Sequence, residues 1–102
     1  HGQCVRFIKE TARNLGLSGV EVIRADVGRF LKGKAEPFDL VFADPPYDLP
    51  MLSQLPTMIL DGGFLAPDGV LIVEHPSTRK LVAHPAWQET RKYGYSSFSF
   101  YG

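Results

Sequence analysis

Four consecutive residues, Asp44-Pro45-Pro46-Tyr47, are the ones in this sequence best suited to chemistry, because they combine a carboxylate with an aromatic ring. They follow the apolar run Phe38–Ala43, which predicts a strand buried on both faces of a parallel sheet. Since proline has no N–H to donate to a neighbouring strand, pairing must stop at Pro45. Asp44 and Tyr47 are therefore expected at the carboxyl end of a central strand, where open α/β sheets bind their ligands.

The tetrapeptide resembles the signature of methyltransferases that act on exocyclic amino groups of nucleobases. The resemblance implies that Asp44 and the Pro45 carbonyl accept hydrogen bonds from the amine, which turns its lone pair toward the incoming methyl group. Pro46 keeps Pro45 extended, and Tyr47 offers a face on which a flipped-out base stacks. Asp44, Pro45, Pro46 and Tyr47 are thus the predicted catalytic residues, acting by positioning and electrostatics. The alternative is a Pro-Pro turn capped by Asp44, with Tyr47 only packing.

The length, composition and charge of the sequence exclude several other classes of protein. A chain of 102 residues makes at most one domain. No apolar run approaches the ~20 residues of a membrane span, and there is no signal-peptide pattern. The single cysteine, Cys4, excludes an internal disulfide and supplies no metal cluster. Residues 35–74 contain seven acids and no lysine or arginine. This acidic middle suits a cationic sulfonium and an amine, and the basic flanks suit phosphates.

The periodicity predicts alternating helices and strands, followed by a hairpin. A turn is expected at Ala66-Pro67-Asp68-Gly69. This order predicts an α/β fold, a partial Rossmann-like sheet of parallel strands with an antiparallel hairpin at one edge. The expected helices are Gln3–Leu15, Val27–Lys32, Pro50–Leu55 and Pro56–Leu60, the expected strands are Val20–Ala25, Phe38–Ala43 and Val70–Glu74, and the expected hairpin joins Trp87–Lys92 to Ser96–Tyr101.

Further segments resemble bacterial small-subunit (16S) ribosomal RNA guanine-N2 methyltransferases, class I enzymes that depend on S-adenosylmethionine. The resemblance covers nearly the whole chain. It implies S-adenosyl-L-methionine as cofactor, small-subunit ribosomal RNA as partner, no metal, no membrane partner and a cytoplasmic location. The segments that carry it are Cys4–Lys9, Leu15–Leu17, Leu65–Gly69, Val73–His75, Lys92–Gly94 and Ser99–Tyr101.

The same resemblance assigns part of a cofactor site. Asp26 matches the acidic residue that hydrogen-bonds the cofactor's adenine amino group, and Val27 supplies a backbone contact to the same ring. Asp44 is predicted to contact the cofactor as well as the base. The simpler interpretation of Asp26 is a cap of the helix that follows it.

The glycine-rich loop and the ribose-binding acid of such enzymes are not found in these residues. Leu15–Gly19 follows a helix rather than a strand, so it is not that loop. Residues 1–102 are therefore expected to form the carboxyl-terminal part of a single methyltransferase domain that is inactive alone. With the first two strands of the usual order missing, either Val20–Ala25 pairs directly with Phe38–Ala43 or another chain fills the gap between them, and direct pairing is favoured.

Other residues receive weaker predictions. Glu74 and His75 are expected to line the base pocket or only to satisfy backbone groups, with His75 as a less favoured catalytic base. His84 and Trp87 have no spacing that suggests a site, and Trp87 is expected to serve in packing. Lys92 and Tyr93 are candidates for contact with RNA.

Two functions compete with the leading one. An adenine-N6 DNA methyltransferase shares the tetrapeptide, but it needs a target-recognition segment, and the connection from Glu74 to Trp87 is too short for one. A non-enzymatic α/β module that binds RNA or protein is the second alternative.

Overall fold

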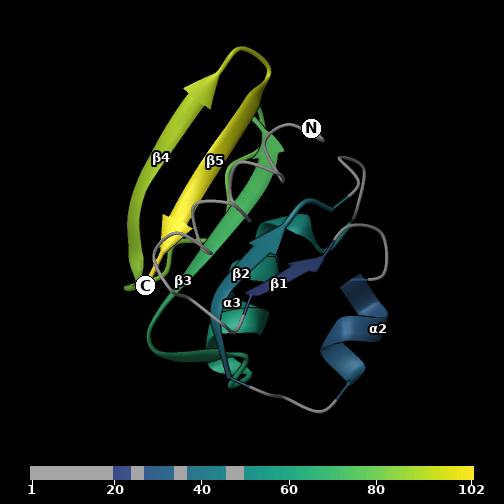
Figure 1. Ribbon diagram of the computed structural model, residues 1–102. Helices are drawn as coiled ribbons and strands as arrows, with labels where there is room; N and C mark the ends of the chain where they lie inside the picture. Colours follow the sequence, from purple (N-terminus) through teal and green to yellow (C-terminus); the bar gives the residue numbers. More distant parts are fainter. Residues whose placement is uncertain (1–19, 24–26, 34–36, 46–49) are drawn as a thin grey trace.

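The computed structural model describes residues 20–23, 27–33, 37–45 and 50–102. These residues contain one five-stranded sheet with the order β1-β2-β3-β5-β4 (Figure 1). The first three strands run parallel, and β5 and β4 form an antiparallel hairpin at one edge. The predicted mixed α/β sheet is therefore confirmed. The strands are β1 Val20–Ile23, β2 Phe38–Ala43, β3 Leu65–Pro76, β4 Trp87–Tyr93 and β5 Ser96–Tyr101.

The direct pairing of the first two strands is also confirmed. β1 and β2 are parallel neighbours from Val20 opposite Leu40 to Ile23 opposite Ala43. Ala43 in turn lies opposite Val73 of β3. The carboxyl ends of all three parallel strands consequently meet at the same edge of the sheet.

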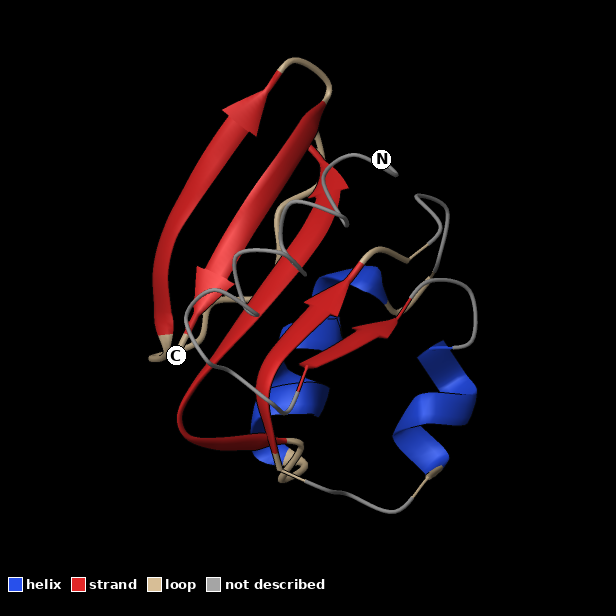
Figure 2. Ribbon diagram, viewed as in Figure 1, coloured by secondary structure: helices blue, strands red, loops and turns tan. Residues whose placement is uncertain are grey.

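The described helices are α2 Val27–Lys32, the 3-10 helix η1 Leu52–Gln54 and α3 Leu55–Asp61. The predicted break between two short helices is present, but it falls before Leu55 rather than before Pro56. Pro56 lies in the first turn of α3, where its missing N–H has no partner to lose. Helices α2 and α3 lie on the same side of the sheet (Figure 2). The predicted helix Gln3–Leu15 falls outside the described residues.

β2 is buried on both faces, as its continuous apolar sequence predicted. Val41 and Ala43 contact the larger core cluster, together with Leu55 and Ile59 of α3. Leu40 and Phe42 point to the opposite face, where Ile72, Phe98 and Phe100 complete a second cluster. Packing on both faces fixes the end of β2, and thus the position of Asp44.

The turn predicted at Ala66–Gly69 is wrong as a boundary, because β3 continues through it. Phe38 lies opposite Leu65, but Leu40 lies opposite Val70, so the intervening residues bulge out of the ladder. Asp68 takes a φ of 64°. A Cβ on Gly69 would lie 2.8 Å from the Ala66 carbonyl oxygen, so only glycine fits there without a shift.

The predicted hairpin is confirmed, with β4 one residue longer than expected. Tyr93 lies opposite Ser96, which leaves Gly94 and Tyr95 as a two-residue turn. Gly94 has a φ of 65°, the left-handed value that such turns demand. Among the described residues, no helix combines the length and apolar character needed to cross a membrane.

Candidate functional site

Asp44 and Pro45 lie immediately beyond β2, at the carboxyl edge of the sheet. Asp44 is partly exposed and Pro45 is buried. The register that pairs Ala43 with Val73 brings these two residues beside Glu74 and His75, the next residues of β3. The edge therefore gathers a carboxylate, a proline carbonyl and the end of β3.

The start of α2 belongs to the same edge, because Ile23 lies opposite Ala43 and Val27 is the first residue of the helix. The structure thus brings the predicted cofactor contact Val27 to the side of the sheet that carries Asp44. Of the other predicted site residues, Asp26, Pro46 and Tyr47 lie outside the described residues.

The hairpin turn reaches this edge as well. Ser96 lies opposite Pro76, the last residue of β3, so the turn before Ser96 projects from the carboxyl end. Tyr95 is 91% exposed there, and Tyr93 is also exposed. The Ser77 amide donates to the Tyr95 carbonyl over 2.8 Å, which ties the turn to the chain leaving β3.

His75 is buried and both of its ring nitrogens are engaged. Nδ1 lies 2.9 Å from the Arg79 carbonyl oxygen and 3.1 Å from the Pro76 carbonyl oxygen. Since a carbonyl only accepts, Nδ1 carries the proton, and Nε2 of the neutral ring accepts from the Ser99 hydroxyl over 2.8 Å. His75 therefore satisfies backbone groups, as one of its two predicted roles required. A role as catalytic base is disfavoured, because Nε2 is already occupied.

From His75, a chain of side-chain hydrogen bonds runs outward through the Ser99 hydroxyl. Having donated to His75, Ser99 Oγ accepts from the Thr90 hydroxyl over 2.8 Å. Thr90 Oγ1 accepts in turn from the indole Nε1–H of Trp87 over 3.0 Å. The indole can only donate and the Arg79 carbonyl can only accept, so with the His75 ring singly protonated at Nδ1 every hydrogen in the chain points the same way.

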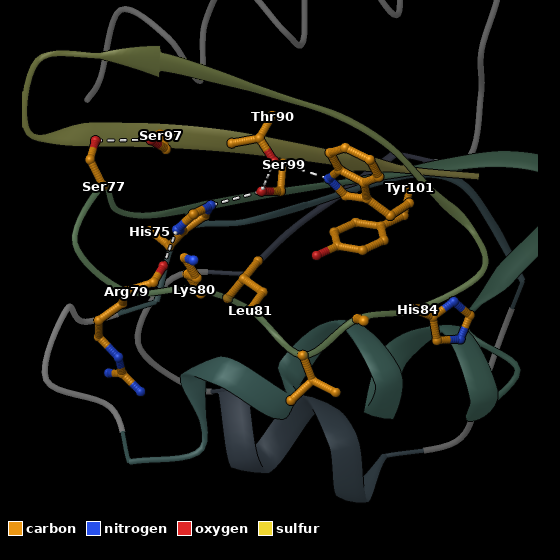
Figure 3. Close-up of a pocket in the computed structure, with 13 residues that line it drawn as sticks. His75, Ser77, Arg79, Lys80, Leu81, His84, Thr90, Ser97, Ser99 and Tyr101 are labelled. Carbon is orange, nitrogen blue, oxygen red and sulfur yellow. Dashed lines mark hydrogen bonds between the residues drawn. The ribbon is translucent and has the colours of Figure 1, made fainter.

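Residues 77–86, here called the strap, connect β3 to β4. A cavity of about 350 Å³ opens between the strap and these hydrogen-bonded side chains (Figure 3). The sheet provides hydroxyls and aromatic rings, and the strap provides apolar and basic side chains. No carboxylate is among the described residues that line the cavity. These are His75, Ser77, Arg79, Lys80, Leu81, Val82, Ala83, His84, Trp87, Thr90, Ser97, Ser99 and Tyr101.

The strap is fastened to the helices beside it. The Val82 amide donates to the Ser53 carbonyl of η1 over 2.7 Å. His84 Nδ1 accepts from the Ala86 amide over 3.0 Å, so Nε2 carries the proton and donates to Asp61 of α3 over 3.1 Å. The strap, which covers the cavity, is therefore held in place by hydrogen bonds to η1 and α3.

Trp87 corrects a prediction, because it is 52% exposed and lines the cavity instead of serving only in packing. Tyr101 forms part of the same wall and is almost fully buried. Burial raises the pKa of the Tyr101 phenol to about 12. Tyr101 is thus a neutral hydrogen-bonding group over the whole physiological range.

Sequence reasoning missed the cavity, although one signal for it exists. Ser97, Ser99 and Tyr101 alternate along β5 and all point inward. Small hydroxyls on the buried face of a strand indicate a polar interior rather than an apolar core. Within the described part of the chain, no group of His, Cys, Asp and Glu side chains is placed to hold a metal ion.

A family model described as conserved hypothetical protein 95 matches residues 1–102. The chain is 27% identical over 103 residues to ribosomal RNA small subunit methyltransferase D of Buchnera aphidicola, covering 94% of the chain and 53% of that relative. It is 30% identical over 81 residues to the protein of the same name from Escherichia coli K12, covering 79% of the chain and 40% of that relative. The chain thus spans about half the length of these curated relatives.

Solved structures agree with the fold. A candidate methylase of Haemophilus influenzae superposes with a TM-score of 0.62 at 26% identity, over 94% of this chain and 63% of that one. A hypothetical protein of Thermus thermophilus gives a TM-score of 0.58 at 30% identity, over 99% of this chain and 57% of that one.

Proposed function

Because this chain belongs to the family described as conserved hypothetical protein 95, we propose that it contributes to an enzyme that methylates guanine N2 in small-subunit ribosomal RNA. The names of the curated relatives support a methyltransferase acting on this RNA. The guanine, its N2 atom and the residues that perform the reaction are our own assignment. The observation that carries it is the position of Asp44-Pro45 at the carboxyl edge, directly beyond a strand that is buried on both faces.

Asp44 has the properties needed to accept a hydrogen bond from the exocyclic amine. Its carboxylate is partly exposed, so a base can reach it, and the two core clusters on β2 hold its backbone in place. Asp44 accepts one hydrogen bond from the exocyclic amine and the Pro45 carbonyl accepts the second. These two acceptors orient the nitrogen lone pair, which is otherwise delocalised into the ring. Pro46 restricts Pro45 to extended backbone, and Tyr47 stacks on the base.

The residues at this edge fit the adenine end of S-adenosylmethionine. The parallel pairing of β1 and β2 supports a position of Val27, the first residue of α2, near the edge that carries Asp44, and Asp26 precedes Val27 in the sequence. The Asp44 carboxylate is also complementary to a positively charged sulfonium. When bound, the cofactor supplies an electrophilic methyl group. The chain's own part is to hold the adenine, through Asp26 and the Val27 backbone, and to orient the amine.

The test compares Asp44→Ala with Asp44→Asn in the full-length protein, using labelled methyl transfer to small-subunit ribosomal RNA. Ala should lower the rate at least about 10²-fold, as expected when one preorganised polar contact is lost at a reacting centre. Asn should be milder, because its amide oxygen still accepts from the amine. Asp39→Asn is the matched control, since Asp39 lies near the opposite end of β2. Equal rates for wild type and Asp44→Ala would refute the mechanism.

Analysis of the methylated nucleoside separates the proposed reaction from its rivals. N2-methylguanosine is the expected product. N6-methyladenosine in DNA would support the adenine enzyme instead, although the short strap leaves no room for a target-recognition segment between β3 and β4. RNA binding without any methyl transfer would support the non-enzymatic module.

A further inference from the structure

We propose that the cavity under the strap binds one nucleotide of the single-stranded RNA substrate, at a position separate from the nucleotide that is methylated. This inference rests on the proposed function for its RNA substrate. It adds a second base-binding position, formed by β3, β4, β5 and the strap, to the one predicted at Asp44 and Tyr47.

The size and charge of the cavity suit a nucleotide. Its volume of about 350 Å³ is at the small end of ligand sites, large enough for one base with its sugar but not for an extended ligand. Lys80 is an exposed cation at the cavity, and no acid stands among the described lining residues. A phosphate therefore meets favourable charge and no carboxylate to repel it.

Trp87 is suited to stack on a nucleotide base. Half of its surface is exposed, yet its Nε1–H is held by Thr90 over 3.0 Å, so the ring is oriented before any ligand arrives. Bases stack on such rings with little dependence on sequence, because every base has a π face. A fixed ring loses less conformational freedom on binding than a mobile one. Trp87 lines the cavity together with Thr90, Ser99 and Tyr101 of the sheet, and the last three are labelled in Figure 3.

The inner polar groups leave a defined set of contacts for a ligand. Ser99 is buried and bonded to both His75 and Thr90, whereas Thr90 is exposed and its hydrogen goes to Ser99, so Thr90 Oγ1 is left as an acceptor for a ligand. Base amino and imino groups and the ribose hydroxyls are donors that match such acceptors. The cavity is thus complementary to the base and sugar at its sheet wall, and to the phosphate at Lys80.

One end of the cavity reaches the carboxyl edge that carries Asp44 and Pro45. His75 is a lining residue on β3, two positions beyond Val73, which is the partner of Ala43. Pro45 is two positions beyond Ala43, so it is beside His75 on the adjacent strand. Adjacent strands are about 4.8 Å apart. Trp87, in contrast, lies opposite Tyr101, which lies opposite Leu71, so it is two strands from β3 and away from the carboxyl edge. A base stacked on Trp87 and a base held at Asp44 are therefore separate positions, and the His75 end of the cavity lies between them.

Fluorescence of the 102-residue chain tests the cavity directly, because Trp87 is its only tryptophan. The probe is a single-stranded uridine pentanucleotide, compared with uridine monophosphate and with inorganic phosphate. We expect saturable quenching of Trp87 by the pentanucleotide, with weaker binding of the mononucleotide. Quenching that saturates equally well with the mononucleotide would overturn the RNA assignment in favour of a small-molecule site. Absence of quenching by all three probes, with the folded state verified by circular dichroism, would overturn the proposal.

Variants in the full-length protein give a second, independent measurement by anisotropy of fluorescein-labelled RNA. Trp87→Leu should weaken binding roughly tenfold or more, while Trp87→Phe keeps most of the affinity because the ring still stacks. Lys80→Gln should lower the slope of log affinity against log salt by about 0.7. The controls are Met58→Ala, an exposed apolar side chain on α3 that is outside the cavity lining, and Lys32→Gln, an exposed cation on α2. Losses as large in the controls as in the cavity variants would refute the site.

Methyl transfer separates this inference from the function it rests on. If wild-type protein methylates the RNA and Trp87→Leu has an unchanged KM, the second base position is wrong and the proposed function stands. If wild-type protein transfers no methyl group but Trp87→Leu still loses RNA affinity selectively, the cavity assignment stands and the proposed function is wrong.

Discussion

Replacing Ser99 by Ala tests the hydrogen-bond chain that supports the cavity. Ser99 takes part in two of its bonds, the 2.8 Å contact with His75 Nε2 and the 2.8 Å contact with Thr90 Oγ1. The change leaves the buried Nε2 without a donor, since Nδ1 must keep the proton that it gives to the Arg79 carbonyl. A buried acceptor left unsatisfied costs about 1–3 kcal/mol. Because the site borders a cavity that water can enter, we expect the free energy of unfolding to fall by about 1–2 kcal/mol.

Thr90→Val is the matched control for this prediction. Thr90 is exposed, so water can take over its bond to the Trp87 indole, and Ser99 still donates to His75. The expected loss is within about 0.5 kcal/mol. Urea denaturation of the three proteins, with equal m-values as a check on two-state behaviour, gives the comparison. A Ser99→Ala protein as stable as wild type, or a Thr90→Val protein that loses more, would refute the direction assigned to the chain.

Three further predictions concern the fold and the reaction. Gly69→Ala should cost about 1–3 kcal/mol of stability, because the added Cβ meets the backbone oxygens of Ala66 and Phe38. Gly94→Ala has free space around its Cβ and costs only the backbone strain of a φ of 65°. Similar urea midpoints for the two variants would contradict this prediction. The free energy of unfolding should fall by up to about 2–3 kcal/mol as pH rises from 10 to 12, because Tyr101 ionises in the unfolded chain in this range but keeps its proton in the folded state. Tyr101→Phe should abolish this part of the pH dependence. Tyr47→Phe should retain most methyl transfer in the full-length protein and Tyr47→Ala should lose much of it, since stacking needs the ring; an equal loss in both would assign the role to the hydroxyl.

The elements that the sequence predicted best are those whose residues determine their structure locally. Phe38–Ala43 is apolar at nearly every position, and both core clusters of the structure use it. The hairpin was predictable because Gly94 supplies the positive φ that its turn requires. Asp44 could be located because Pro45 must end the strand before it.

The remaining features depend on contacts between distant segments. Ala66–Gly69 has the composition of a turn, yet pairing of Leu65 with Phe38 extends β3 and turns these residues into a bulge. The cavity combines residues from His75 to Tyr101, and only the antiparallel register of β3, β5 and β4 brings Ser99 to both His75 and Thr90. No local pattern reports such a register, so the exposure of Trp87 could not be predicted either.

The hydrogen bond from the Val82 amide to Ser53 makes one amide proton a reporter of strap opening. Hydrogen exchange at Val82 requires only that the strap lifts from η1, which costs less than unfolding the sheet. An occupant that holds the strap down slows this exchange in proportion to its saturation of the cavity. Because η1 begins five residues after Tyr47, an occupant that holds the strap to η1 is also linked along the sequence to the proposed catalytic motif. Binding at the two positions is then linked, and by reciprocity each occupant strengthens the other to the same degree.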